Sequence, residues 1–273
     1  MKNAYLTHLA IIPRTWACSV LLTFVLISHP VWAKDSSHGV SQALTLKNMH
    51  LSLMQLSQTI EARIDKMKLI AKSIANDTHI QAWVNDDFPE DQVNLLVEKL
   101  GFYVKEYDLT SASFADKKSH KYWNHEGFLR VLQTGIDTWY FAYLKSMQQD
   151  LISVYHDQNK KRVDVYVNYQ QLNGNGLSGI ATSFDGVVEM LNTSEFAKQG
   201  DVYLVDSSGK VQVHANSAIA GSVNINTLFG EQAVSKVMHE QQTSFIETSE
   251  QMFLGASYIP SMGWYVVVSI KQP

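Results

Sequence analysis

Arg130 and the aromatic segment Asp137-Thr-Trp-Tyr-Phe-Ala-Tyr-Leu144 have the residue types and the spacing that suit the binding of a small molecule. The segment places four aromatic side chains within five positions, and the arginine precedes it by seven residues. A small-molecule pocket needs an apolar wall and a few polar groups that fix the ligand, and a guanidinium forks onto a carboxylate or another planar anion. We therefore predict that Trp139 and Tyr140 form the wall of a pocket that Arg130 completes.

The same residues also allow a purely structural interpretation. An aromatic cluster suits a hydrophobic core, and Arg130 suits an ion pair with Asp137 across a loop. We assign Phe141 and Tyr143 to the core, because alternate positions of the segment must face inward. Both interpretations of Arg130 stay open at this stage.

The sequence contains no arrangement typical of catalysis or of metal binding. Its ten histidines show no HExxH or other metal-type pairing, and no nucleophile has a base at a recognisable spacing. The turn Asn173-Gly-Asn-Gly176 is too short to cradle a phosphate. We therefore predict a protein that is not an enzyme and that uses neither a metal ion nor a cofactor.

Length and charge set the broad class of the protein. The chain of 273 residues is 45% hydrophobic and 18% charged, so it can bury the core of one large or two modest domains. Its formal net charge is -4, whereas nucleic acid is normally bound by a basic face. We expect no nucleic-acid partner.

Residues 1–33 have the composition of a secretory signal peptide. Their charged residues are Lys2 and Arg14, and Val31-Trp32-Ala33 suits a cleavage site. The clean apolar stretch is about 13 residues long, short of the roughly 20 that a spanning helix needs. We predict cleavage after Ala33 and secretion to the periplasm; the alternative is an uncleaved anchor in the inner membrane. The single cysteine, Cys18, lies in this stretch, which excludes disulfides and thiolate catalysis from the mature chain.

A long helix is predicted after a polar linker at about residues 34–40, and the two together make up residues 34–76. Apolar residues recur along the helix at steps of three and four, at Leu46, Met49, Leu53, Leu56, Ile60, Ile64, Met67, Ala71 and Ile74. This apolar stripe either packs along the flank of its own domain or pairs with the same helix of a second copy in a homodimer.

Two units of mixed helices and antiparallel strands are predicted beyond the long helix, at residues 77–195 and 196–273. In the first, a helix from Pro89 to Leu100 precedes strands near 109–114, 151–155, 163–169 and 177–184, and Asp185 is expected to cap a short helix. In the second, strands at 202–205 and 211–213 flank the turn Asp206-Ser-Ser-Gly209, and a helix at 228–238 precedes three strands. The predicted fold class is α+β.

The order of these elements resembles a double Cache domain, a PAS-like periplasmic sensor. The resemblance covers roughly residues 44–270, with Asp206-Ser-Ser-Gly-Lys210 and Met262-Gly-Trp-Tyr-Val266 at the expected places in the second unit. A narrower set of motifs resembles the sensor regions of bacterial diguanylate cyclases, namely Tyr107-Asp-Leu-Thr-Ser-Ala-Ser-Phe114, Tyr122-Trp123, the segment 137–144, Tyr155, Val167-Asn-Tyr169 and Gly179.

The resemblance implies that the first, membrane-distal unit holds a ligand between the Trp-Tyr motif and the facing strands. The residues that this implicates are Arg130, Trp139 and Tyr140, with Tyr122, Tyr155 and Asn168 as further members of the pocket. Amino-acid-binding members carry an aspartate two residues after the strand glycine, where it pairs with the ligand ammonium, and this sequence has Ala181 there. The implied ligand is a small organic molecule other than an α-amino acid.

Two functional hypotheses follow from these observations. The first is a secreted periplasmic sensor that binds a small molecule and signals through a separate membrane-bound protein, such as a diguanylate cyclase or a chemoreceptor. A separate partner is expected because no kinase, cyclase or second apolar segment follows residue 264. The second is a structural or assembly factor that docks constitutively through its long helix and senses nothing.

Overall fold

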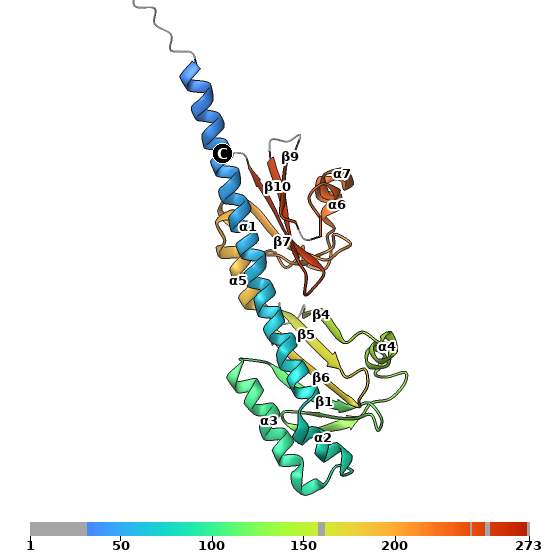
Figure 1. Ribbon diagram of the computed structural model, residues 1–273. Coiled ribbons are helices and arrows are strands. Elements are labelled where there is room, and N and C mark those ends of the chain that lie inside the picture. Colours follow the sequence, from blue (N-terminus) through green and yellow to red (C-terminus); the bar gives the residue numbers. More distant parts are fainter. Residues whose placement is uncertain (1–31, 158–161, 241, 249–251, 272–273) are drawn as a thin grey trace, which may run out of the picture. The chain divides into compact units, whose positions relative to one another are not determined.

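The computed structural model describes residues 32–157, 162–240, 242–248 and 252–271 (Figure 1). Residues 1–31 lie outside this set, and with them all of the predicted signal peptide and alternative anchor except Trp32 and Ala33. The chain divides into two compact units, residues 1–44 and 45–273, and the packing reported below belongs to the second. No helix in the described ranges combines the length and apolar character of a membrane span.

The first helix, α1, spans Trp32–Ala75. Helical backbone therefore replaces the linker predicted at 34–40; that stretch contains no proline, the residue that most strongly breaks a helix. From residue 45 on, the apolar stripe is buried as predicted, at Met49, Leu53, Ile60, Ile64, Met67, Ala71 and Ile74. This face belongs to one hydrophobic core that also takes residues from both sheets.

The first sheet has six antiparallel strands in the order β3-β2-β1-β6-β5-β4. The strands are β1 (Ser111–Asp116), β2 (Lys121–Asn124), β3 (Gly127–Val131), β4 (Asp150–Asp157), β5 (Arg162–Gln170) and β6 (Gly176–Ser183). The helices α2 (Thr78–Asn85), η1 (Glu90–Gln92) and α3 (Val93–Glu106) precede the sheet, and α4 (Thr138–Ser146) joins β3 to β4. The strands predicted near 151–155, 163–169 and 177–184 are confirmed as β4, β5 and β6, which are neighbours in the sheet. Helix α2 and the short strands β2 and β3 were not predicted.

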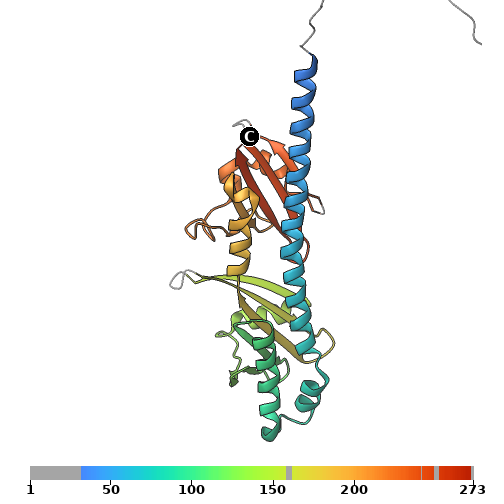
Figure 2. The same ribbon diagram turned by 90° about the vertical axis from the view of Figure 1, so that its left-hand side faces the viewer.

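The second sheet has five antiparallel strands in the order β8-β7-β11-β10-β9. Its strands are β7 (Gly200–Val205), β8 (Val211–Val213), β9 (Ser244–Glu247), β10 (Met252–Ile259) and β11 (Trp264–Lys271). Between the sheets lie α5 (Asp185–Thr193) and η2 (Glu195–Lys198), and α6 (Ile225–Phe229) and α7 (Glu231–Ser235) follow β8. Figure 2 shows the strands of this sheet beside α1.

Two local predictions in these connections are wrong. The helix expected at 228–238 is split into α6 and α7, because Gly230 has a φ of 81°, outside the range of a helix. The residue before α5 is Phe184, so Asp185 lies in the first turn and does not cap the helix. A carboxylate in a first turn still interacts favourably with the helix dipole.

The two faces of the first sheet have different neighbours. One face carries the buried residues Ala112, Phe114, Val165, Val167 and Ile180, which share a core with α1. Ser178 on this face also donates a hydrogen bond to the Ala71 carbonyl of α1. The side chains at alternate positions point the other way, and α4 lies on that opposite face, which is the face that carries the candidate site.

Candidate ligand-binding site

The floor of the candidate site is made by two rows of residues across four neighbouring strands. Register places Ser113, Gly179, Asn168 and Leu151 in one row of paired residues. The second row is Ser111, Ala181, Tyr166 and Ser153. Because side chains alternate between the faces of a strand, the members of both rows share one face of the sheet. All of these residues line a cavity of about 670 Å³.

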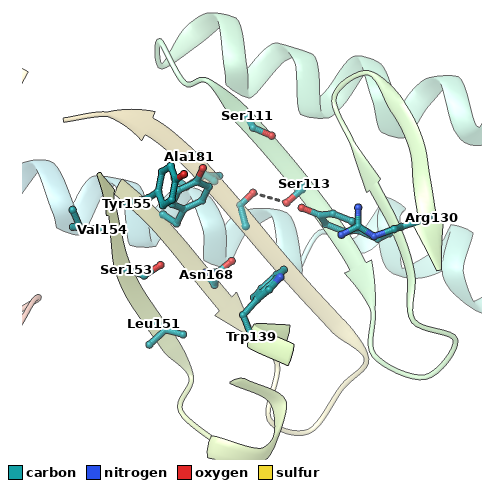
Figure 3. A pocket seen from close by; sticks show the side chains of 14 residues that line it. Ser111, Ser113, Arg130, Trp139, Leu151, Ser153, Val154, Tyr155, Asn168 and Ala181 are labelled. Atoms are coloured by element: carbon teal, nitrogen blue, oxygen red, sulfur yellow. Dashed lines mark hydrogen bonds between the residues drawn. The ribbon is translucent and has the colours of Figure 1, made fainter. Parts of the chain in front are cut away.

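The walls of the cavity come from the paired strands β2 and β3, from β4 and from α4. Tyr122 of β2 and Arg130 of β3 are paired residues, and both line the cavity together with Trp139 of α4 and Tyr155 of β4. In Figure 3, Arg130 and Tyr155 stand at opposite sides of the floor, with Asn168 between them. A volume of this size lies within the range of pockets that bind small molecules.

Arg130 pairs with Asp137 while it lines the cavity. Its Nη2 lies 2.6 Å from Asp137 Oδ1, and Asp137 Oδ2 accepts a second hydrogen bond from the Gln133 backbone N–H at 2.9 Å. The hydrogen bond from Arg130, followed by the one from Gln133, holds the pKa of Asp137 below its ordinary value. The Asp137 side chain is 3% exposed and the Arg130 side chain 54% exposed. The guanidinium is thus anchored at one nitrogen and open to the cavity elsewhere.

The aromatic segment forms the helix α4. Its buried and exposed side chains are not the ones that the sequence analysis predicted. Helical spacing puts Tyr140 and Tyr143 on the buried face, where both are almost fully enclosed, while Trp139 is 46% exposed. Phe141 is only partly buried against the same cluster. The assumption of alternating positions is wrong for this segment, because a helix repeats every 3.6 residues.

Tyr140 consequently lies beneath the site and does not line it. Its hydroxyl lies 3.1 Å from His120 Nδ1, and its ring packs with Leu132 and Leu177. Burial raises the pKa of Tyr140 well above the ordinary value for tyrosine. Of the six predicted site residues, the structure brings five to the cavity, namely Tyr122, Arg130, Trp139, Tyr155 and Asn168, and places Tyr140 in the core.

The polar residues of the floor were missed by the sequence analysis, apart from Asn168. Ser111 and Ser113 of β1, Ser153 of β4 and Tyr166 of β5 line the cavity. Two of them could have been found from the alternation of side chains along a strand, because residues two positions apart share one face. Tyr166 is two residues from Asn168, and Ser153 is two residues from Tyr155. Ser113 Oγ donates a hydrogen bond of 2.9 Å to the Gly179 carbonyl, drawn as a dashed line in Figure 3.

The described residues around the cavity suit an organic ligand more than a metal ion. Across the described ranges no three histidine, cysteine or acidic side chains come together in a way that could hold a metal. The lining combines hydroxyls, one amide, one guanidinium and the faces of aromatic rings. Such a site can fix a small molecule through hydrogen bonds and stacking.

Comparison with known proteins identifies the fold. No family model matches the sequence. The ligand-binding domain of the amino acid chemoreceptor PctC of Pseudomonas aeruginosa PAO1, solved in complex with GABA, has a TM-score of 0.63 and 14% identity, over 83% of this chain and 100% of that one. This chain has the fold of double Cache sensor domains. The fold class predicted from the sequence is confirmed.

Two further structures show the breadth of proteins that share this fold. The ligand-binding domain of the Pseudomonas fluorescens chemoreceptor CtaA, in complex with L-isoleucine, has a TM-score of 0.60 and 13% identity over 87% of this chain and 96% of that one. A domain assigned to a sensory box/GGDEF family protein from Vibrio parahaemolyticus has the same TM-score of 0.60 and 13% identity, over 83% and 96%. The likeness therefore extends to chemoreceptors and does not single out cyclase-linked sensors.

Proposed function

We propose that this protein is a ligand-binding sensor domain that acts outside the cytoplasm and takes a small organic molecule into the cavity of its first sheet. The observation that carries the proposal is the register of β1, β6, β5 and β4, which gathers the polar floor beneath Trp139 and Arg130. The shared fold supports it, since similar domains have been solved with GABA and with L-isoleucine.

The proposed ligand is not an α-amino acid. Ala181 lies on the floor, at the position where the resemblance places the aspartate that pairs with the ligand ammonium in amino-acid-binding members. No aspartate or glutamate is among the described residues that line the cavity. An ammonium group inside it would lose its hydration without gaining a partner of opposite charge.

We further propose that the protein is secreted to the periplasm after cleavage at residue 33 and that it passes its state to a separate membrane-bound signalling protein. Ligand binding that favours one of two arrangements of the domain would be read by this partner along α1. Co-purification of a membrane protein with the tagged chain, in a ligand-dependent amount, tests the partnership. Capture of the same amount with and without ligand would favour the constitutive assembly factor instead.

A thermal-shift screen tests the sensing function directly. The purified chain is heated with a panel of metabolites that includes amino acids, amines, organic acids and nucleobases. A ligand at one hundred times its dissociation constant stabilises the folded state by about 2.7 kcal/mol, which raises the melting temperature by several degrees. A folded protein that no compound of the panel stabilises would contradict the proposal.

A further inference from the structure

The amide of Asn168 is the one side-chain amide on the described lining of the cavity, and it can donate and accept hydrogen bonds side by side. The residue is 8% exposed, and its side chain points onto the floor of the cavity (Figure 3). Its amide has no hydrogen-bond partner among the residues that the structure describes. Its amide atoms are not among the fully enclosed polar atoms that lack a partner, so they face the open cavity, where they offer one acceptor beside two donors. A ligand that fills this site therefore gains by presenting a donor next to an acceptor.

The charges around the cavity disfavour an ionic ligand. Arg130 is its one charged lining residue among those described, and Asp137 already balances that charge at 2.6 Å. A carboxylate ligand on the free side of Arg130 would bring a second negative charge to the same guanidinium, close to Asp137. A cationic ligand would find no acidic side chain on the described lining. The site thus suits a ligand without net charge.

The aromatic side chains favour a flat ligand. Trp139 of α4 and Tyr155 of β4 line the wall of the cavity. Tyr166 of β5 lies on its floor. Each of these three rings keeps more than a third of its surface exposed, although each contributes to the cavity. A planar molecule can cover an exposed ring by stacking on it, and this gain does not depend on a charge.

We propose that the cavity binds a purine, with the Asn168 amide pairing with the donor and acceptor edge of the base and an aromatic ring stacking on its face. An asparagine amide matches N6 and N7 of adenine in a two-bond pair, and the volume of about 670 Å³ leaves room for an attached sugar. The free N–H groups of Arg130 point to further acceptors on the ligand. This assignment rests on the proposed function, since it names the ligand class of the same cavity.

Calorimetric titration of the purified chain with adenine, hypoxanthine, L-isoleucine and GABA tests the assignment. Adenine binds at one site per chain, and more tightly than hypoxanthine, which presents two acceptors on the edge where adenine presents a donor and an acceptor. Asn168→Asp replaces the two donors with an acceptor and weakens adenine binding by about tenfold or more. Asn192→Asp, an exposed substitution on α5, leaves the affinity unchanged.

A second variant keeps the assignment testable if Asn168→Asp fails to fold. Trp139→Ala removes a half-exposed side chain, so the fold is retained while adenine binding weakens by about tenfold. Binding of L-isoleucine or GABA without binding of either purine overturns the ligand class and leaves the sensing function intact. Equal adenine affinity in the wild type and in a folded Asn168→Asp variant overturns the role of Asn168. The absence of binding by any compound of the wider thermal-shift panel contradicts the sensing function itself.

Discussion

Asn168 and Gly179 are paired across β5 and β6, and the Asn168 amide lies over the glycine. A β-carbon on residue 179 would lie 2.7 Å from Asn168 Oδ1, closer than β-carbons come in proteins, and 3.0 Å from Ser113 Oγ, which is tighter than most such contacts. Because Gly179 has no side chain, the Asn168 amide and the Ser113 hydroxyl have room to lie against it on the floor of the cavity. The glycine acts on the cavity through its neighbours.

Gly179→Ala is expected to weaken ligand binding with little loss of stability. The new methyl group displaces the ends of two side chains and no backbone atom, so the free energy of unfolding changes by about 1 kcal/mol or less, while the affinity falls by about tenfold as the amide moves. Denaturant unfolding and calorimetry measure the two effects. Gly101→Ala in α3 is the control for affinity, because its new methyl group meets nothing within 4 Å and should change only stability, by a gain of about 0.5–1 kcal/mol. An unchanged affinity for Gly179→Ala would show that the amide does not contact the ligand.

The pair of Arg130 and Asp137 predicts a pH dependence. The pKa of Asp137 is lower in the folded chain than its ordinary value of 3.8, so the ionised carboxylate stabilises the fold above that pH. The contribution is lost as the pH falls through the still lower pKa of the folded state. At pH 7 we expect Asp137→Asn to be less stable than the wild type, and the difference to shrink below pH 3.8.

Urea unfolding at pH 7 and at pH 3 measures this difference. Asp65→Asn changes an exposed aspartate of α1 and is the control. Its difference in stability from the wild type should be the same at pH 7 and at pH 3. A stability difference for Asp137→Asn that persists unchanged at pH 3 would contradict the sign of the effect. The variant also frees Arg130 from its counter-charge, so carboxylate ligands should bind it better than they bind the wild type.

Trp139 and Tyr140 are neighbours in sequence with opposite expected effects. Tyr140→Ala removes a fully buried ring and should lower the free energy of unfolding by about 3–5 kcal/mol. Trp139→Ala removes a half-exposed ring, so it should cost far less stability and act on ligand affinity. Tyr140→Phe isolates the hydroxyl bond to His120 and should cost about 0.5–1.5 kcal/mol with no change in affinity. Ligand affinity that falls in Tyr140→Phe but not in Trp139→Ala would reverse the assignment of the two residues.

Helices and strands were predicted from the sequence more fully than the pairing and register of the strands. Alternating apolar residues identified β4, β5 and β6, because each is long and bounded by turn residues. The pairing of Asn168 with both Gly179 and Leu151 depends on the register, which a one-residue slip would change and which composition does not determine.

The aromatic segment shows why the candidate site was predicted only in part. Tyr, Trp and Phe are favoured in strands, so their density suggested alternation. Tertiary context decides otherwise: Asp137 binds Arg130 and the Gln133 N–H just before the helix, and Tyr140 and Tyr143 then fall on one buried face. The short strands β2 and β3 were not predicted from the sequence, although the equally short β8 and β9 were.

Glu61 of α1 offers a test of how the long helix is held on the second sheet. Its carboxylate accepts hydrogen bonds from the Ser261 backbone N–H at 3.0 Å and from Ser261 Oγ at 2.7 Å, at the turn between β10 and β11. Hydrogen bonds to a charged group contribute about 1.5–3 kcal/mol, so Glu61→Ala should lower the free energy of unfolding by that order. Denaturant unfolding measures the loss, with Asp65→Ala, one turn further along α1 and exposed, as the control that should change stability by about 0.5 kcal/mol or less. If Glu61→Ala is as stable as the control, the contact with Ser261 contributes nothing to holding α1 on the second sheet.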